Sequence, residues 1–485
     1  MTPSARGVAV ATGWLLAVVV ALLAFRLLAS ALTTRYLAQE ARSELAVLRA
    51  GQPLWRWRFL SPEDFVAGRA FGPARTRAVD GGVEVTSLDG TAFELGLPIA
   101  RGLDLLHWPL LRLDRAAAQP VTLQVVWQTT GQPACLSAPI VWRGTRIDVD
   151  LRSINTTTTP CAPVNRADML RLRITMPRGQ RLLLDDAALL APDPLALVPP
   201  QPALDGSSAA DSANPAPAVP IVRLAAMASA EQLLARRDAA VAWRPAAIVV
   251  AGDASLRKPP REPLPPWLSW LGVGAYVLVL CWLARRPRPA WQTLLAGLLG
   301  PVILVAGLQW GQRPTLAGVT GFASALIFAA YTQRAGRSAD WRWIGPWRSV
   351  AWWWPLALVP AALLVCLLWG HASDPTPPRR ALVYLGWAAL QQWLILGFAL
   401  GQLEKFLPVR WAVLAAALAF ALLHVPNGAL MHLCFLAELW WAWCFVQQRS
   451  LLPIALAHAA CALVVGAGLI GNGLRSLEVS ARFFL

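Results

Sequence analysis

The sequence predicts a polytopic α-helical membrane bundle of about nine spans with an N-terminal extracytoplasmic antiparallel β-sandwich domain. Of the 485 residues, 56% are hydrophobic and only 14% are charged, which is too apolar for a soluble protein of this length. Apolar runs of about 18 or more residues, the length of a helix that crosses a bilayer, occur once near the N-terminus and repeatedly after Pro266. Between these runs the chain is polar and shows the alternation of β-strands.

The first apolar run, residues 7–32, is predicted to be a retained transmembrane anchor. The run is longer than the apolar core of a signal peptide, and no clear small-residue cleavage site precedes Arg35. Arg26 lies near the far end of the run, where a long cationic side chain can extend toward the interface.

Residues 33–192 are predicted to form the β-sandwich domain, which is jelly-roll-like. Strand-like alternation occurs at residues 83–86, 121–125, 146–151 and 170–175. Several short strands with polar turns between them are typical of an antiparallel sandwich. The segment from Leu170 to Asp186, with a turn at 177–180, resembles the last hairpin of galactose-binding-like jelly rolls.

Five tryptophans of this domain have two possible roles. They either stack on the sugar rings of a bound glycan or fill the core, which is the commoner role of aromatic residues in a sandwich. The five are Trp55, Trp57, Trp108, Trp127 and Trp142. The same domain holds Cys135 and Cys161, the two cysteines of seven that lie outside the apolar runs, and such a pair can form a disulfide outside the cytoplasm.

Residues 193–265 are predicted to be a linker with a short helix. The stretch up to Ala218 is rich in Pro, Ala, Ser and Asp and cannot bury enough apolar surface to order itself. A helical pattern follows at about 229–241.

Eight more spans are predicted in a membrane domain at residues 266–475. They are 267–284, 291–310, 316–333, 349–370, 381–403, 411–426, 429–447 and 451–470. With the N-terminus in the cytoplasm, the Arg-rich loops near Arg286, Arg337 and Arg410 lie inside, as the positive-inside rule requires. We therefore interpret the net charge of +16 as a sign of topology and expect no nucleic-acid partner. The prediction is a multi-pass protein of the bacterial inner membrane with a periplasmic domain.

Polar residues within the last spans are the candidates for chemistry, because polar side chains are costly in hydrocarbon and usually face the bundle interior. Three of the five histidines, His424, His432 and His458, lie within 35 residues of one another. Gln391 and Gln392 lie near the middle of the 381–403 span, and Glu438 lies near the centre of the 429–447 span.

Residues 380–465 resemble the CAAX protease and bacteriocin-processing family of intramembrane proteases. That family carries E-E-x-x-x-R, F-x-x-x-H and H-x-x-x-N on successive membrane helices. Phe420 and His424 match the second motif, and the run from Gln448 to His458 is similar to the approach to the third. The resemblance implies an endopeptidase in which a glutamate and the histidines activate water, while His and Asn stabilise the oxyanion.

The sequence departs from the motifs at four positions: Gln391 and Gln392 replace the glutamate pair, Leu396 the Arg, and Ala462 the Asn. A Gln amide cannot accept the proton of water near neutral pH, although it can orient water or donate to an oxyanion. Our hypothesis is that Glu438, with His424 and His458, forms a rearranged water-activating site. The alternative is that Glu438 only holds neighbouring helices together.

The remaining polar residues have less specific interpretations. Asn427 either replaces the missing Asn of the third motif or caps a helix, and His432, outside the motifs, is expected to be structural. Three histidines and a carboxylate are also zinc-type ligands. No H-E-x-x-H motif is present, however, so no cofactor is expected and zinc stays a minor alternative.

Three functions follow from these patterns. The first is an intramembrane endopeptidase of CAAX-processing type that cleaves a membrane-anchored protein substrate in the lipid bilayer. The second is a catalytically degenerate relative that acts as a membrane scaffold or binds a partner, with a periplasmic domain that could bind a glycan. The third, a transporter or polysaccharide-assembly component, is less favoured because no inverted repeat is evident. Convergence of Gln391, His424, Glu438 and His458 on one polar cavity would favour the enzyme.

Overall fold

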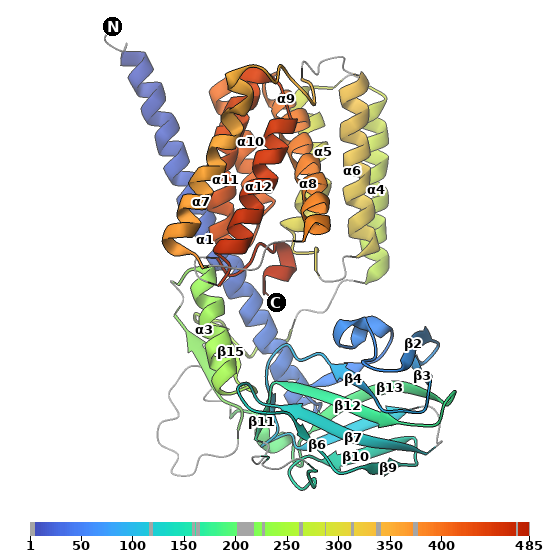
Figure 1. The fold of residues 1–485 in the computed structure, drawn as a ribbon. Helices are drawn as coiled ribbons and strands as arrows, with labels where there is room; N and C mark the ends of the chain where they lie inside the picture. The colour runs from blue at the N-terminus through green and yellow to red at the C-terminus, as the bar shows by residue number, and fades with distance from the viewer. Residues whose placement is uncertain are drawn as a thin grey trace. The chain divides into compact units, whose positions relative to one another are not determined.

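The computed structural model forms two compact units, each described here by itself (Figure 1). One unit contains residues 34–226 and 235–261, and the other contains residues 1–33, 227–234 and 262–485. The structure describes residues 5–115, 120–157, 161, 165–200, 218–225, 228–260, 265–286, 288–311, 315–335, 341–371, 377–471 and 474–484.

Two antiparallel sheets make up most of the first unit. The larger sheet has the order β10-β6-β13-β3-β2, with β1 also paired to β13. Its strands are β1 (Arg56–Arg58), β2 (Ala74–Val79), β3 (Gly82–Ser87), β6 (Leu110–Arg115), β10 (Arg146–Asp150) and β13 (Arg181–Leu190). The second sheet has the order β4-β12-β7-β8, with β9 also paired to β7. Its strands are β4 (Phe93–Leu97), β7 (Val121–Gln128), β8 (Cys135–Leu136), β9 (Ile140–Trp142) and β12 (Met169–Thr175).

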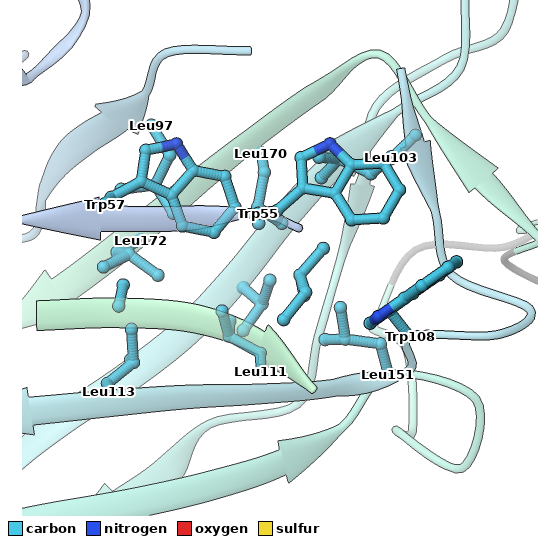
Figure 2. Packing of buried hydrophobic residues seen from close by; sticks show 14 of the residues in the cluster. Trp55, Trp57, Leu97, Leu103, Trp108, Leu111, Leu113, Leu151, Leu170 and Leu172 are labelled. Atoms are coloured by element: carbon cyan, nitrogen blue, oxygen red, sulfur yellow. The ribbon is translucent and has the colours of Figure 1, made fainter. Parts of the chain in front are cut away.

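Both sheets contribute to one apolar core (Figure 2). The alternation that predicted the strands is the alternation of burial: along β12, Leu170, Leu172 and Ile174 are fully buried, while the residues between them are partly exposed. The predicted N-terminal antiparallel β domain is therefore present. That its two sheets form a sandwich stays a prediction.

The five tryptophans of this domain belong to its core. Each is at most 8% exposed, and Figure 2 shows Trp55, Trp57 and Trp108 among the leucines of the two sheets. Buried indole rings cannot stack on a sugar, so the core role is the correct one of the two. A glycan site on this domain would have to use other residues.

The predicted last hairpin is wrong. β12 pairs with β4 and β7, whereas β13 pairs with β1, β3 and β6, so the turn at 177–180 joins strands of different sheets. Both strands have one apolar face, and this face is buried equally well when each strand pairs within its own sheet. Cys135 and Cys161 form a disulfide with their Cα atoms 5.9 Å apart.

Residues 218–260 contain more secondary structure than the sequence predicted. The expected helix is present as α3 (Ala230–Trp243), and it connects β14 (Ile221–Leu224) to the parallel strand β15 (Ile248–Ala251). Neither strand was predicted from the sequence, since four apolar residues such as Ile248–Ala251 are too short a run to show a period.

Apolar helices dominate the second unit, and each predicted span overlaps one of them. The first helix, however, continues to Arg49, so residues 33–49, which were predicted to be part of the β domain, are helical. The helices are α1 (Ala5–Arg49), α4 (Pro266–Ala284), α5 (Ala290–Val305), α6 (Leu316–Ala335), η4 with α7 (Val350–Ala357, Leu358–Trp369), α8 with η5 and α9 (Pro378–Gln392, Trp393–Leu400, Gly401–Leu403), α10 (Val409–Leu422), α11 (Gly428–Gln448) and α12 (Leu452–Gly468). Within the described residues, six of these segments are long and apolar enough to cross a membrane, while α5, α10 and α12 are shorter. The protein is thus a membrane protein with several apolar helices, and the number of spans stays a prediction.

Glycines allow the helices around the candidate site to approach closely. A Cβ atom on Gly300 of α5 would lie 2.6 Å from the backbone oxygen of Gly321 in α6. Similarly, the ring of Phe398 packs directly on Gly297 of α5, where a side chain would not fit. Small residues at helix crossings replace the hydrophobic driving force that is missing in lipid. The contact between Phe398 and Gly297 places the η5 segment, which follows the two glutamines, directly against α5.

Candidate active site

Gln391 and Gln392 are the last residues of α8, immediately before the π-helix η5. π-Helical segments inside α-helices are rare and often occur at functional sites. Successive residues of a helix point about 100° apart, so the two amides face different surroundings. Gln391 is partly exposed and lines a cavity, whereas the Gln392 side chain is completely buried.

Gln392 joins two other predicted site residues. Its Nε2 atom donates a hydrogen bond of 3.0 Å to Oε2 of Glu438 on α11 and lies 3.2 Å from Nδ1 of His458 on α12. The amide nitrogen of Gln392 thus faces both partners, and an amide nitrogen can only donate. His458 Nδ1 then accepts, and the ring proton of His458 is on Nε2.

His424 follows α10 and has the opposite tautomer. Its Nδ1 atom lies 2.8 Å from the backbone oxygen of Phe420, one helical turn earlier. Because a carbonyl oxygen only accepts, Nδ1 carries the proton and Nε2 has a free lone pair. Both imidazoles pack against the Phe420 ring, with centroid distances of 4.8 Å for His424 and 5.5 Å for His458. The Phe of the second motif thus holds the two histidines beside each other.

Both histidines and Gln391 line one cavity of about 580 Å³. Its wall is mainly aliphatic and aromatic, with contributions from α5, α6, α7, α8, η5, α11 and α12 and from residues 423–424, which follow α10. The ionisable or hydrogen-bonding residues of the wall include Tyr384, Gln391, His424, Cys434, His458, Cys461, Glu478 and Arg482. An apolar pocket with a few convergent polar groups is the usual form of a binding site for an apolar ligand.

Glu438 and Gln392 lie behind this wall. Neither residue lines the cavity, and both side chains have no exposed surface. Oε1 of Gln392 and Oε1 of Glu438 have no hydrogen-bond partner among the described residues, although each is buried. Unsatisfied buried oxygens are costly, and such groups concentrate where function requires them. The predicted convergence on the cavity therefore holds for Gln391, His424 and His458, while Glu438 reaches it only through Gln392 and His458.

Asn427 and His432 have contacts that differ from those of the two cavity histidines. Asn427 caps α11, since its Oδ1 accepts from the backbone N–H of Leu430 at 3.1 Å. Its Nδ2 donates to the backbone oxygens of Ser476 and Glu478. His432 lies between backbone oxygens of Gly428 and of Leu22 in α1, an arrangement that agrees with a structural role.

The part of the chain that the structure describes contains no set of ligands for the alternative zinc site. No group of three or more His, Cys, Asp or Glu side chains there is arranged to hold a metal ion. Glu438 faces Gln392, and His424 bonds to a backbone oxygen.

Several residues of the site were not predicted from the sequence. Tyr384 and Trp441 pack against the His458 ring, with centroid distances of 6.4 and 5.3 Å. Tyr384 is seven residues before Gln391, two helical turns away, so helical spacing placed it on the same face. Glu478 and Arg482, near the C-terminus, are adjacent to no motif and had no signal in the sequence.

The fold and the site together define a helical membrane protein with a histidine-lined cavity between its last helices. Residues 232–464 match the family model described as Type II CAAX prenyl endopeptidase Rce1-like. These residues are therefore Rce1-like, which confirms the predicted resemblance to the CAAX protease and bacteriocin-processing family and extends it well before residue 380. No curated protein and no solved structure matches the chain.

Proposed function

We propose that the protein is an intramembrane endopeptidase that hydrolyses a peptide bond of a membrane-anchored protein substrate. The observation that carries this proposal is that His424, His458 and Gln391, from three helices, line one cavity in a region that matches an endopeptidase family. The proposal also includes the location in the bacterial inner membrane, a cytoplasmic N-terminus and a periplasmic β domain, which are based on the arginines of the short loops.

His424 is the proposed general base. Its Nε2 lone pair is free because Nδ1 donates to Phe420, and the side chain lines the cavity. A water molecule that donates to Nε2 loses its proton as its oxygen attacks the peptide carbonyl. The His424 imidazolium then returns this proton to the leaving amine, so that the products are a carboxylic acid and an amine.

His458 is the proposed oxyanion donor. With Nδ1 accepting from Gln392, the Nε2–H of His458 is available to the negative charge that develops on the carbonyl oxygen. Gln391, whose amide also borders the cavity, is a second donor. Two such donors supply the stabilisation that the family's His and Asn provide, in a chain where Ala462 occupies the position of that Asn.

Glu438 and Gln392 are proposed to be positioning residues. The carboxylate orients the Gln392 amide, and the amide selects the tautomer of His458. This assignment changes the role first expected for Glu438, since its carboxylate does not border the cavity and cannot take a proton from water there. The proposed reaction uses no metal or other cofactor.

The substrate is proposed to enter as an apolar chain. The cavity wall is largely aliphatic and aromatic, so it suits the apolar residues or lipid chain of a membrane-anchored protein better than a soluble peptide. The bilayer is therefore both the solvent and a partner of the protein. We propose no nucleic-acid partner, because the arginines collect in the short loops between apolar runs.

The proposal is tested with the full-length protein in proteoliposomes that also contain membrane proteins of the expression host. New peptide termini are scored by mass spectrometry for the wild type and for His424→Ala and His458→Ala. We expect termini that appear with the wild type and are lost with either variant. Equal sets of termini from all three proteins would contradict the proposal and favour the scaffold, because both glutamate positions hold amides.

A further inference from the structure

The described residues after α12, Leu474–Phe484, form a C-terminal strap that lies along the histidine-lined cavity. Leu477, Glu478, Val479 and Arg482 of this strap are part of the cavity wall. The strap lies beyond residue 464, where the family match ends. It ends in the short helix η6 (Ser480–Phe484), near the label C in Figure 1.

The strap is bound next to His424. The backbone N–H of Ser480 donates to the oxygen of Val425 at 2.7 Å, one residue after His424. On its other side the strap joins the end of the α5 segment: Trp310 N–H donates to Ser480 Oγ at 3.0 Å, and Ala481 N–H donates to the Trp310 oxygen at 3.1 Å. Trp310 itself lines the cavity. The strap therefore runs along the cavity wall between the residues that follow α10 and those that follow α5.

Asn427 holds the strap by its side chain. Nδ2 donates to the backbone oxygens of Ser476 at 2.7 Å and Glu478 at 3.2 Å, while Oδ1 caps α11. The Asn427 side chain is completely buried. A residue that only caps a helix does not need an amide, so the second contact explains why Asn rather than Ser or Asp occupies this position.

The polar residues of the strap distinguish it from the rest of the wall. Glu478 and Arg482 form an ion pair at 3.1 Å, and their side chains are 45% and 40% exposed. A pair that keeps this much contact with water contributes little to stability, so the strap is held at Asn427, Val425 and Trp310 rather than by its charges. The rings of Phe483 and Phe484, which are 1% exposed, must also leave their packing when the strap is displaced.

We propose that the C-terminal strap is an autoinhibitory gate with Asn427 as its latch. The strap closes the cavity beside His424, and a substrate chain reaches His424 and His458 after the strap is displaced. The gate controls access to the cavity whether or not the cavity is catalytic. Its test therefore measures access and not hydrolysis.

Native cysteines report on access. Cys434 and Cys461 line the cavity, whereas Cys281 is exposed on α4 and serves as an internal reference. The full-length protein in proteoliposomes is treated with N-ethylmaleimide, and the alkylation rate of each cysteine is measured by peptide mass spectrometry. The readout needs no substrate.

One variant releases the strap. Asn427→Ser retains an oxygen that caps α11 but loses the amide that binds the strap. A second variant, Gly466→Ala, is its control, because the new Cβ atom would lie 2.9 Å from Cδ1 of Leu477, the end of a flexible side chain that can turn aside without moving the strap backbone. We expect Asn427→Ser to be alkylated at Cys434 and Cys461 roughly fivefold faster than the wild type, with Cys281 unchanged, and Gly466→Ala to react at the wild-type rate.

A third variant locks the strap. A Cβ atom on Gly311 would lie 4.0 Å from the Cβ atom of Ala481, within the range of a disulfide. The double substitution Gly311→Cys with Ala481→Cys should therefore crosslink under oxidation, and each single substitution is its control. The oxidised form should react more slowly than the wild type at Cys434 and Cys461, and reduction should restore the rate.

The outcomes separate this inference from the proposed function. Equal rates in the released, locked and wild-type proteins, or failure of the pair to crosslink, would overturn the gate. If the rates change as expected but no protein cleaves a substrate, the gate stands and the endopeptidase proposal fails.

Discussion

Buried polar side chains have different hydrogen-bond partners in the two units of the molecule. In the β domain, the buried Ser87, Arg115 and Ser137 exchange hydrogen bonds with nearby backbone groups; Arg115, for example, donates to the oxygens of Trp142 and Gly144. In the helical unit, Gln392, Glu438 and His458 bond to one another from three helices, and two of their oxygens have no partner among the described residues. Buried atoms without a partner among the described residues also occur in the β domain, as at Nε1 of Trp55 and Trp142. The feature particular to the helical unit is therefore the network of polar side chains from three helices.

The largest expected effect is the loss of substrate cleavage when His424 is replaced. Replacing His424 by Ala removes the proposed base and should lower the rate of substrate cleavage by about 10² to 10⁴-fold. Cleavage is measured in proteoliposomes against a terminus found with the wild type. His432→Ala is the matched control, because His432 contacts backbone oxygens away from the cavity. A similar loss in both variants would contradict a specific role for His424.

Removal of the disulfide between Cys135 and Cys161 tests whether the stability of the β domain affects substrate cleavage by the helical unit. Cys135 and Cys161 are 26 residues apart in sequence, and replacing both by Ser should lower the free energy of unfolding of this domain by about 3 kcal/mol. Pulse proteolysis in urea, with peptides of β7 and β12 identified by mass spectrometry, measures the change. Cys281→Ser, which removes a free thiol, is the control. Cleavage by the helical unit should persist in the disulfide variant, and its loss would mean that the two regions are not separable.

The contact between Gln392 and Glu438 should contribute a smaller energy. A double-mutant cycle with Gln392→Met and Glu438→Gln should give a coupling free energy of about 1 kcal/mol, as for other polar contacts within membranes. Steric trapping in bicelles measures the unfolding free energies. Gln391→Met is the control, since Gln391 faces the cavity and should show no coupling to Glu438. Zero coupling at Gln392 would show that the carboxylate does not orient the amide.

Much of this architecture could be predicted because the signals are local. Each predicted span coincides with an apolar helix, and the predicted strands coincide with β3, β7, β10 and β12. Strand pairing is not local. The short turn after β12 suggested a hairpin with β13, yet the partners of β13 come from strands more than 90 residues earlier as well as from nearer ones.

The residues of the site could be predicted from the sequence, but the contacts between them could not. The scarcity of polar residues in apolar helices singled out His424, His458, Glu438 and the glutamine pair. Which glutamine meets Glu438 depends on the rotation of α8 and on the π-helix after it, and neither has a sequence signal. Likewise, capping was an expected role of Asn427, but its contact with the strap depends on a segment about 50 residues later.

The smallest expected effect is at the surface of the β domain. Arg112 forms hydrogen bonds with Asp148 at 2.8 and 2.7 Å and holds the pKa of that carboxyl below its usual value. The stabilisation is present above the pKa of the unfolded carboxyl and is lost as the pH falls through the lowered pKa. At pH 7, Arg112→Ala should cost less than about 1 kcal/mol in the same urea proteolysis, because the side chains are 34% and 41% exposed. A larger decrease in the free energy of unfolding would show that this exposed ion pair contributes more to the domain than exposed pairs usually do.

The most direct test of the central claim is the fate of the water oxygen. Proteoliposomes that contain the wild type and its substrate are incubated in water enriched in ¹⁸O, and the new C-terminal carboxylate is examined by mass spectrometry. Hydrolysis with His424 as the base predicts incorporation of ¹⁸O with the wild type and its near absence with His424→Ala. Equal incorporation by both proteins would contradict the account, since water would then be activated without the histidine that borders the cavity.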